Sequence, residues 1–313
     1  MNSKTVIPLI MASFILATCQ SPDDKTATQQ FPTPDSTSVT SSTAAPPLFS
    51  YIVPRTIRVK DYFPFMDSLV RHYDSLVPYQ LTEHLLVRSN PRIIDTLEDT
   101  DYYCRMARGE FVYDQRQLPV LHQGDTLYIP DSTSARALLD RMAATWIDVN
   151  IPEFTLRVVE GQDTVQCMTI RVGQNKKRYQ EVLGRVDDLR TRPGIGTIVR
   201  INRAPSLFYD PHTGRRFIYT KRDDGRTTRM PLIPWMEPEI NGIRMGQMIH
   251  PTTNPETLGK AYSNGCIGCT EGEAWRLYYH APEGTKVVIR YDLLLIDPVG
   301  DTTRLPDIYG WAK

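Results

Sequence analysis

The 313-residue sequence carries no net charge, because 36 Lys and Arg residues balance 36 Asp and Glu residues. A domain that binds nucleic acid usually needs surplus cations to displace the counterions condensed on the phosphates. Long hydrophobic runs are also scarce, since the single one lies at the extreme N-terminus. The sequence therefore excludes a multi-span membrane protein and argues against nucleic acid as a partner.

Glycine is less frequent than proline, with 18 Gly against 24 Pro. This balance favours strands, turns and irregular loops over a helical bundle. Hydrophobic residues still make up 41% of the chain and charged residues 23%, which is typical of a protein that folds around a core. The length suffices for about two domains. We therefore expect a mainly β protein, α+β overall.

The first eighteen residues have the features of a secretory signal. Lys4 precedes an apolar stretch, Val6–Thr18, that is too short to span a bilayer. The order Leu16-Ala17-Thr18-Cys19 resembles the lipobox of bacterial lipoproteins, which implies cleavage before Cys19 and acylation of its thiol. A plain signal peptide with a chance cysteine, or a short buried helix, is the alternative. We predict a signal peptide at 1–18, a lipid anchor at Cys19 and a periplasm-facing membrane lipoprotein, with the outer membrane favoured.

The segment 19–50 is built almost wholly from Ser, Thr, Pro, Ala, Asp and Gln. Such a composition cannot bury enough apolar surface to offset the entropy cost of ordering the chain. We predict a disordered tether that holds the folded part near the membrane.

Residues 51–150 form a predicted accessory region. Apolar residues from Met66 to Leu76 recur at helical spacing, and Pro78 ends that helix. Residues 118–130 resemble the closing strand of a LysM glycan-binding module, although a hairpin with a Gly-Asp turn explains the same residues. A further helix is expected to begin at Ser134. The role of this region stays open.

Residues 151–297 are predicted to form a mainly β domain, followed by a C-terminal extension at 298–313. Apolar and polar residues alternate from Phe154, and a turn at 160–163 indicates a hairpin. Further strands are expected at Thr164–Val172, Thr197–Ile201, Arg216–Thr220 and Lys286–Ile296. One helix interrupts them at Glu271–His280, where Thr270 and Glu273 form a capping box.

The chemistry of this domain is concentrated just before that helix. An exported cysteine that acts as a nucleophile must be held as a thiolate, since the thiol itself reacts weakly. His250 can take the proton of Cys266 if the two side chains meet in the fold. Gly265 lets the backbone approach a bound peptide closely and leaves amides open to a developing oxyanion. The residues therefore fit an acyl-transfer site with a Cys/His pair.

The order of these residues resembles the signature of the YkuD-type L,D-transpeptidases. His250 is followed, after fifteen residues, by Cys266 within the sequence Ser-Asn-Gly-Cys-Ile. Other motifs of the family are matched by the hairpin at 151–173, the turn at 191–196, Leu258-Gly259 and the strand at 284–289. The resemblance covers residues 151 to 291 and implies a YkuD-like β-sandwich with one helix after the nucleophile.

The resemblance also implies the activity. Cys266 would attack the carbonyl of meso-diaminopimelate in a peptidoglycan tetrapeptide stem, with His250 as the general base. The resulting thioester would form 3→3 cross-links or exchange the terminal D-amino acid in cell-wall biogenesis. The carbonyl of Pro251 would orient the histidine, while Ser263, Asn264 and Gly265 would line the acyl pocket. We expect no metal and no organic cofactor.

One departure from the family pattern concerns the position after the Cys-Ile pair. The family usually has Arg there, whereas this sequence has Gly268 followed by Cys269. Arg276 and Arg290 are the candidates to replace it. The lost Arg also favours one alternative function, a non-catalytic peptidoglycan-binding lipoprotein with a degenerate transpeptidase domain.

The spacing of the two cysteines leaves further alternatives open. Cys266 and Cys269 match a dithiol redox motif, and a reversible disulfide between them would silence the nucleophile. His250 and His280 could complete a structural zinc site with the same two cysteines. Neither surrounding sequence matches a thioredoxin-like unit or a zinc finger.

Overall fold

The computed structural model describes residues 48–180, 184–204, 209, 214–296 and 300–312. The predicted signal peptide, the lipidation site Cys19 and the tether up to residue 47 lie outside the described residues. All described residues belong to one compact unit. None of its helices combines the length and the apolar character that crossing a membrane requires.

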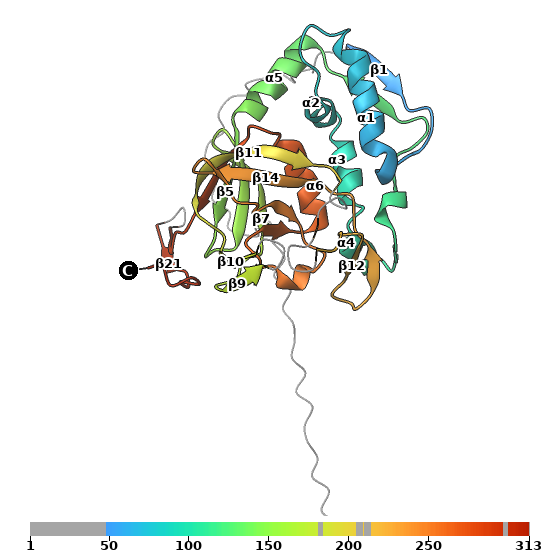
Figure 1. Ribbon diagram of the computed structural model, residues 1–313. Coiled ribbons are helices and arrows are strands. Elements are labelled where there is room, and N and C mark those ends of the chain that lie inside the picture. The colour runs from blue at the N-terminus through green and yellow to red at the C-terminus, as the bar shows by residue number, and fades with distance from the viewer. Residues whose placement is uncertain (1–47, 181–183, 205–208, 210–213, 297–299, 313) are drawn as a thin grey trace, which may run out of the picture. The chain divides into compact units, whose positions relative to one another are not determined.

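The N-terminal region combines short helices with short strands (Figure 1). Its elements are β1 (Phe49–Ile52), β2 (Ile57–Arg58), α1 (Val59–Asp74), α2 (Glu83–Arg88), α3 (Arg92–Glu98), α4 (Tyr102–Ala107), a 3-10 turn (Gln115–Gln117), β3 (Pro119–Leu121), β4 (Thr126–Ile129) and α5 (Ser132–Ala143). Strand β1 begins inside the segment predicted as tether, because Phe49 pairs with Ile129 of β4.

Two local predictions in this region are wrong. Strands β3 and β4 do not form a hairpin, since β3 pairs with β2 and β4 pairs with β1. The amide of Gly124 donates instead to the carbonyl of Val53, at 2.9 Å. Helix α5 begins at Ser132 rather than Ser134, because the carboxylate of Asp131 accepts from the first free amides of the helix.

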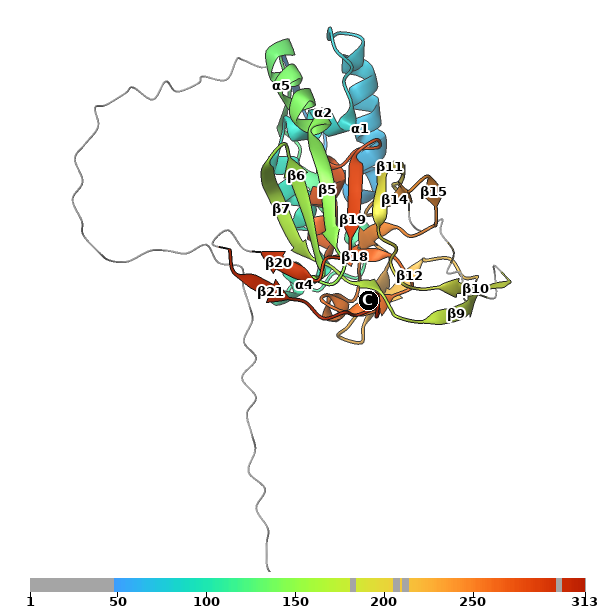
Figure 2. The same ribbon diagram turned by 90° about the vertical axis from the view of Figure 1, so that its left-hand side faces the viewer.

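A nine-stranded mixed sheet forms the centre of the remaining chain. Its strands follow the order β18, β16, β14, β11, β19, β5, β6, β7, and β15 pairs with β14 at the side. Figure 2 shows β7, β6, β5 and β19 next to one another. The strands are β5 (Thr145–Asn150), β6 (Thr155–Glu160), β7 (Asp163–Thr169), β11 (Gly194–Asn202), β14 (Trp235–Ile240), β15 (Ile243–Arg244), β16 (Ile249–Pro251), β18 (Ile267–Cys269) and β19 (Lys286–Arg290). The sheet thus begins at Thr145, before the expected boundary at 151.

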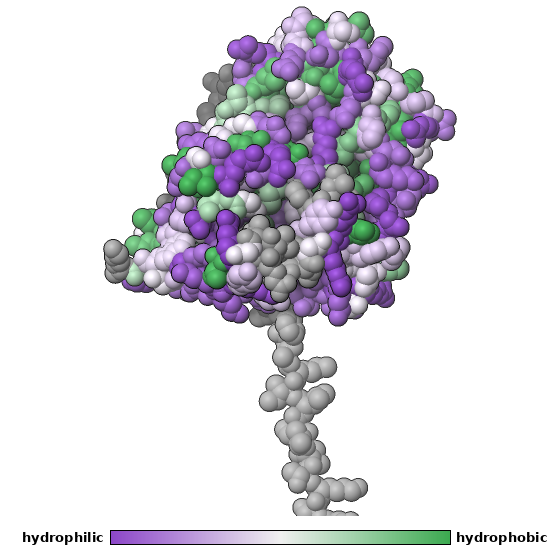
Figure 3. Space-filling view, viewed as in Figure 1, coloured by the Kyte–Doolittle hydropathy of each residue, from purple (hydrophilic) through white to green (hydrophobic). Residues whose placement is uncertain are grey.

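Short strand pairs surround this sheet. They are β8 (Val172–Gly173) with β17 (Ala261–Ser263), β9 (Lys177–Gln180) with β10 (Arg185–Asp188), β12 (Tyr219–Lys221) with β13 (Thr227–Arg229), and β20 (Leu294–Ile296) with β21 (Thr302–Arg304). The run predicted as one strand from Lys286 to Ile296 is therefore two strands. The face visible in Figure 3 is mainly hydrophilic, with small scattered hydrophobic patches.

Helix α6 (Glu271–His280) matches its prediction in both bounds and cap. Thr270 and Glu273 form the expected capping box, and Ala274, Leu277 and Tyr278 are buried. Trp275, which follows Ala274, is also fully buried. The face of α6 that these four side chains form is therefore packed into the protein interior.

The N-terminal region packs on α6 and shares its core. The phenol of Tyr279 lies 2.7 Å from the phenol of Tyr62 in α1 and donates to Glu83 in α2. Helix α3 lies beside α6 in Figure 1, and Arg276 pairs with Glu98 there. One hydrophobic cluster extends through both regions. The predicted fold class, a mainly β domain with one helix after Cys266 and a smaller α+β region before it, is confirmed.

Candidate active site

Cys266 lies directly before strand β18, at the edge of the nine-stranded sheet. Its Sγ atom accepts a hydrogen bond from the backbone N–H of Met248, at 3.3 Å. Burial raises the pKa of this thiol, whereas the Met248 amide and the positive charge of Arg171 lower it. The thiol is therefore protonated at rest unless neighbouring groups favour the thiolate.

His250 is the central residue of β16 and is almost wholly buried. Its ring stacks on Trp235 of β14, with centroids 4.2 Å apart and an interplanar angle of 24°. Nδ1 lies 2.8 Å from the carbonyl oxygen of Pro251. Because a carbonyl can only accept, Nδ1 carries the hydrogen and Nε2 keeps its lone pair. Burial, reinforced by the positive charge of Arg171, lowers the pKa of His250 to about 3, so the ring is a neutral base at pH 7.

Cys266 and His250 line the same groove, whose volume is about 1520 Å³. Its walls come from strands β9, β10, β12, β14 and β16 and from the loop before Cys266. The lining side chains include Arg171, Gln174, Tyr219, Trp235, Tyr262 and Asn264. The fold therefore places along one groove the two residues that the sequence singled out for acyl transfer.

The loop before Cys266 is held by its own side chains. Ser263 is buried, and its hydroxyl donates to the carbonyl of Cys266 at 2.5 Å while accepting from the amide of Gly265 at 3.2 Å. The Gly265 amide is thus occupied rather than open to an oxyanion, contrary to the expectation. Asn264 lines the groove and accepts from Gln174 at 3.1 Å. Ser263 shapes the loop, and both Ser263 and Asn264 line the groove.

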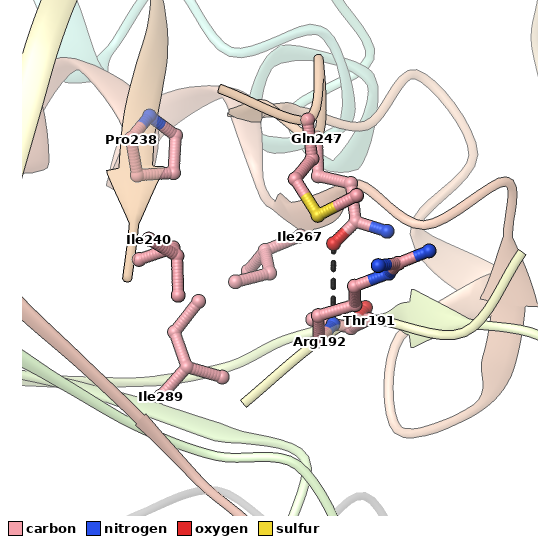
Figure 4. Close-up of a pocket in the computed structure, with 8 residues that line it drawn as sticks. Thr191, Arg192, Pro238, Ile240, Gln247, Ile267 and Ile289 are labelled. Atoms are coloured by element: carbon pink, nitrogen blue, oxygen red, sulfur yellow. Dashed lines mark hydrogen bonds between the residues drawn. The ribbon is translucent and has the colours of Figure 1, made fainter. Parts of the chain in front are cut away.

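Both the backbone conformation at position 265 and the lack of room for a side chain there require a glycine. Its φ is +105°, in the region that side chains disfavour, and a Cβ there would lie 2.6 Å from the Gln247 side-chain nitrogen. Gln247 in turn accepts from the amide of Arg192, as the dashed line in Figure 4 shows, and donates to the carbonyl of Arg190. The turn at 190–192 therefore supports the cysteine loop from behind.

The C-terminal extension also supports this loop, which the sequence did not indicate. Thr191 donates to the carbonyl of Gly265 at 2.9 Å. The phenol of Tyr309 accepts from the amide of Thr191 at 3.2 Å and donates to the carbonyl of Gly173 at 2.5 Å. The sequence shows only a tyrosine near the C-terminal end, and a single tyrosine does not indicate which residues it will contact.

Arg276 and Arg290, the expected replacements for the missing Arg, do not line the groove. Arg276 pairs with Glu98 behind α6, and Arg290 donates to Asp148 at 2.7 Å. The guanidinium that does line the groove belongs to Arg171, which precedes β8. Both candidates are therefore wrong in position.

The structure separates the side chains of the dithiol and zinc alternatives. Cys266 lines the groove, whereas Cys269 is fully buried in the hydrophobic core, and both are free thiols. His280 contacts the carbonyl of Arg276 through Nδ1 at 2.8 Å. Within the described ranges, no group of three or more His, Cys, Asp or Glu side chains could hold a metal ion. The geometry therefore favours neither alternative.

The groove is rich in cations. Eight Arg and Lys residues line it against two Asp residues, the former being Arg171, Lys176, Arg178, Arg185, Arg192, Arg215, Arg216 and Lys221. Asp187 is paired with Arg185, at 2.8 Å. A ligand with several carboxylates would be attracted to these walls.

Comparisons with known proteins place about half of the chain in one family. Residues 144–289 match the family described as YkuD, L,D-transpeptidase catalytic domain. A crystal structure of an L,D-transpeptidase from Xylanimonas cellulosilytica is 14% identical over 76% of this chain and 97% of that chain, with a TM-score of 0.34. An L,D-transpeptidase from Mycobacterium smegmatis is 13% identical over 47% of this chain and 58% of that chain, with a TM-score of 0.31. The catalytic domain from the E. faecium L,D-transpeptidase is 15% identical over 47% of this chain and 96% of that chain, with a TM-score of 0.30. No curated protein sequence matches the chain.

Proposed function

We propose, from the premise that residues 144–289 are a YkuD-type L,D-transpeptidase catalytic domain, that the protein is a cysteine transpeptidase of peptidoglycan tetrapeptide stems. One observation carries the proposal. Cys266 and His250 line one groove, and the carbonyl of Pro251 leaves Nε2 of His250 as the free basic nitrogen. A thiol and a neutral imidazole in one cavity are the two groups that acyl transfer requires.

The proposed reaction has two halves. The sulfur of Cys266 attacks the carbonyl carbon of meso-diaminopimelate, and a C–S bond forms as the C–N bond to the terminal D-Ala breaks. The proton taken from the thiol passes through His250 to the departing amine. An amine then attacks the thioester, an amide forms, and the thiol is restored. A neighbouring stem as acceptor makes a 3→3 cross-link, whereas a free D-amino acid exchanges the stem terminus.

The walls of the groove suit this substrate class. Stem peptides carry several carboxylates, and the groove is lined by eight cationic side chains. Asn264 and Tyr262 line the same groove as Cys266 and offer polar contacts to a peptide backbone. We propose that this wall positions the donor stem. The proposed reaction uses no metal and no organic cofactor.

The location of the activity is part of the proposal. Acylation of Cys19 would anchor the protein to a periplasm-facing membrane, and the tether would let the catalytic domain reach the peptidoglycan. Palmitate labelling of the full chain and of a Cys19→Ala variant tests the anchor. Equal labelling of both proteins would contradict it.

The alternative function is peptidoglycan binding without catalysis. Two observations favour it, namely Gly268 in place of the usual Arg and the raised pKa of the Cys266 thiol. Under this alternative the groove would hold a stem peptide and Cys266 would form no covalent bond with it.

An acylation assay separates the two functions. The full chain is incubated with tetrapeptide stems, and intact mass spectrometry looks for an adduct equal to the stem acyl group without D-Ala. We expect the adduct on the parent protein and on Cys104→Ala, a matched control at an exposed cysteine, and its loss in Cys266→Ala. Binding of stems without any adduct on the parent protein would support the alternative.

A further inference from the structure

Gly268 lies between Arg171 and His250 in one lateral row of backbone pairs. The amide of Arg171 donates to the carbonyl of Gly268 at 2.8 Å, and the Gly268 amide donates back at 3.0 Å. On the other side, Gly268 is the register partner of His250 in the parallel pair of β18 and β16. Residues paired in this way project to the same face of a sheet. Arg171 and His250 therefore flank a position without a side chain.

Cys266 belongs to the same face. Ile267 and Cys269 enter the hydrophobic core, so the alternation along β18 directs positions 266 and 268 to the opposite side. The side chain of Arg171 fills the space above Gly268. A Cβ on Gly268 would lie 2.7 Å from its Nε and 2.9 Å from its Cγ. The absence of a side chain at 268 thus lets Arg171 extend across the strand toward the Cys/His pair.

This guanidinium has no carboxylate partner among the described residues. Its Nη1 donates to the hydroxyl of Thr257 at 3.1 Å, and its buried Nε has no hydrogen-bond partner. A buried cation without a counter-charge is unfavourable unless a neighbouring group supplies the negative charge. A purely structural role for Arg171 would therefore leave its positive charge without a counter-charge.

The ionisable groups around Arg171 narrow the choice of counter-charge. The groups whose negative charge would act most strongly on Arg171 are Cys266, Asp223, Cys269 and Tyr262. Asp223 is engaged by Asn254 and by the amide of Glu256, and Cys269 is fully buried in the core. The Tyr262 side chain is largely exposed to solvent. Cys266 is the group in the groove that needs a positive charge in order to react.

We propose that the Arg171 guanidinium is the counter-charge of the Cys266 thiolate and is held in that place because Gly268 has no side chain. Arg171 is thus a positioning residue for the nucleophile, and its catalytic consequence rests on the proposed function. The same charge lowers the pKa of both Cys266 and His250. This charge therefore favours the thiolate over the thiol at Cys266 and the neutral imidazole over the imidazolium at His250.

The test measures the ionisation of the thiol rather than the reaction. The full chain is alkylated with iodoacetamide from pH 5 to pH 10, and peptide mass spectrometry follows Cys266 separately from the other cysteines. Because only the thiolate reacts, the midpoint of the rate profile reports the ionisation of Cys266. In Arg171→Gln we expect a midpoint about one pH unit higher and a roughly tenfold slower alkylation at pH 7. Arg171→Lys keeps the charge and should lie closer to the parent protein.

Three further variants distinguish charge from packing. Thr257→Val removes the side-chain partner of Arg171 but keeps the charge, so the midpoint should stay near that of the parent protein. Gly268→Ala places a Cβ against the guanidinium and should raise the midpoint as Arg171→Gln does. Arg171→Ala combined with Gly268→Arg supplies the cation from β18 and should lower the midpoint again. Circular dichroism shows which variants keep the parent fold, and Gly268→Ala replaces any Arg171 variant that does not fold.

The outcomes for the two proposals are separable. An unchanged midpoint in a folded Arg171→Gln protein, or equal shifts in Arg171→Gln and Arg171→Lys, would overturn the assignment of Arg171. A raised midpoint without any stem adduct on the parent protein would uphold Arg171 and reject transpeptidation. A stem adduct on the parent protein together with an unchanged midpoint would uphold transpeptidation and reject the role of Arg171.

Discussion

Trp235 stacks on His250, with ring centroids 4.2 Å apart and planes inclined by 24°. The two residues lie on the neighbouring strands β14 and β16, whose pairing places Met236 opposite Ile249. The indole covers one face of the imidazole, while the carbonyl of Pro251 holds its Nδ1. The orientation of the His250 imidazole is thus set by one ring contact and one hydrogen bond.

Replacing this indole should impair the base without unfolding the protein. Stacking of aromatic rings is worth about 1 kcal/mol beyond its buried area, which corresponds to about a fivefold change in rate. In Trp235→Leu we expect the rate of stem acylation to fall by at least that factor and its lower pH limit to rise, because a more exposed imidazole regains part of its ordinary pKa. Trp235→Phe, which keeps a ring, is the matched control. Identical pH profiles for the Leu variant and the parent protein would contradict this role of Trp235.

The half-buried histidine His84 should make the fold sensitive to acid. Burial lowers its pKa to about 4, and its Nε2 contacts the carbonyl of Tyr278 at 3.1 Å. The unfolded chain takes up a proton near pH 6.5, whereas the folded chain does not until about pH 4. The contribution of His84 to stability is therefore fully present above pH 6.5 and is lost as the pH falls toward 4.

Urea unfolding at pH 7 and pH 5 measures this effect. His84 should account for a decrease of roughly 2 kcal/mol in the free energy of unfolding between these two pH values. His84→Gln should show a correspondingly smaller decrease, whereas His122→Gln, at an exposed histidine, should behave like the parent protein. A pH dependence that is the same in all three proteins would rule out a half-buried neutral His84.

A side chain at position 265 should distort the cysteine loop. The φ of Gly265 is +105°, and an added Cβ would meet the Gln247 side chain at 2.6 Å. We expect Gly265→Ala to lose about 1–3 kcal/mol of stability and most of its stem acylation. Gly284→Ala is the matched control, because Gly284 also has a positive φ, of +90°, but nothing within 4 Å of an added Cβ. Similar acylation by both variants would show that the contact with Gln247 is unimportant.

The phenol of Tyr309 should stabilise the site from the C-terminal extension. Tyr309→Phe removes one hydrogen bond to the carbonyl of Gly173 and one from the amide of Thr191. We expect a loss of about 1–3 kcal/mol in thermal or urea unfolding, because both partners are buried. Acylation should also slow, since Thr191 holds the carbonyl of Gly265. Tyr128→Phe, at an exposed phenol, should change neither quantity. Unaltered stability of Tyr309→Phe would mean that the extension does not support the loop.

Several features of this protein could be predicted from local sequence. The capping box of Thr270 and Glu273 and the buried stripe of α6 depend on residues three or four positions apart, so their pattern is visible in the chain. The alternation after Phe154 likewise predicted β6. The pair His250 and Cys266 was recognisable because its spacing and flanking residues form a motif of the YkuD family.

Only the tertiary structure decided which distant residues complete the site. The register of β18 brings Arg171 beside Gly268, and the docking of Tyr309 brings the C-terminal extension to Thr191. Local patterns were also misleading at Gly124, where β3 and β4 each pair with an earlier strand. A short-range pattern records which conformation a segment prefers. The choice among distant partners depends on the packing of the whole core and on where an absent side chain, as at Gly268, leaves space for another.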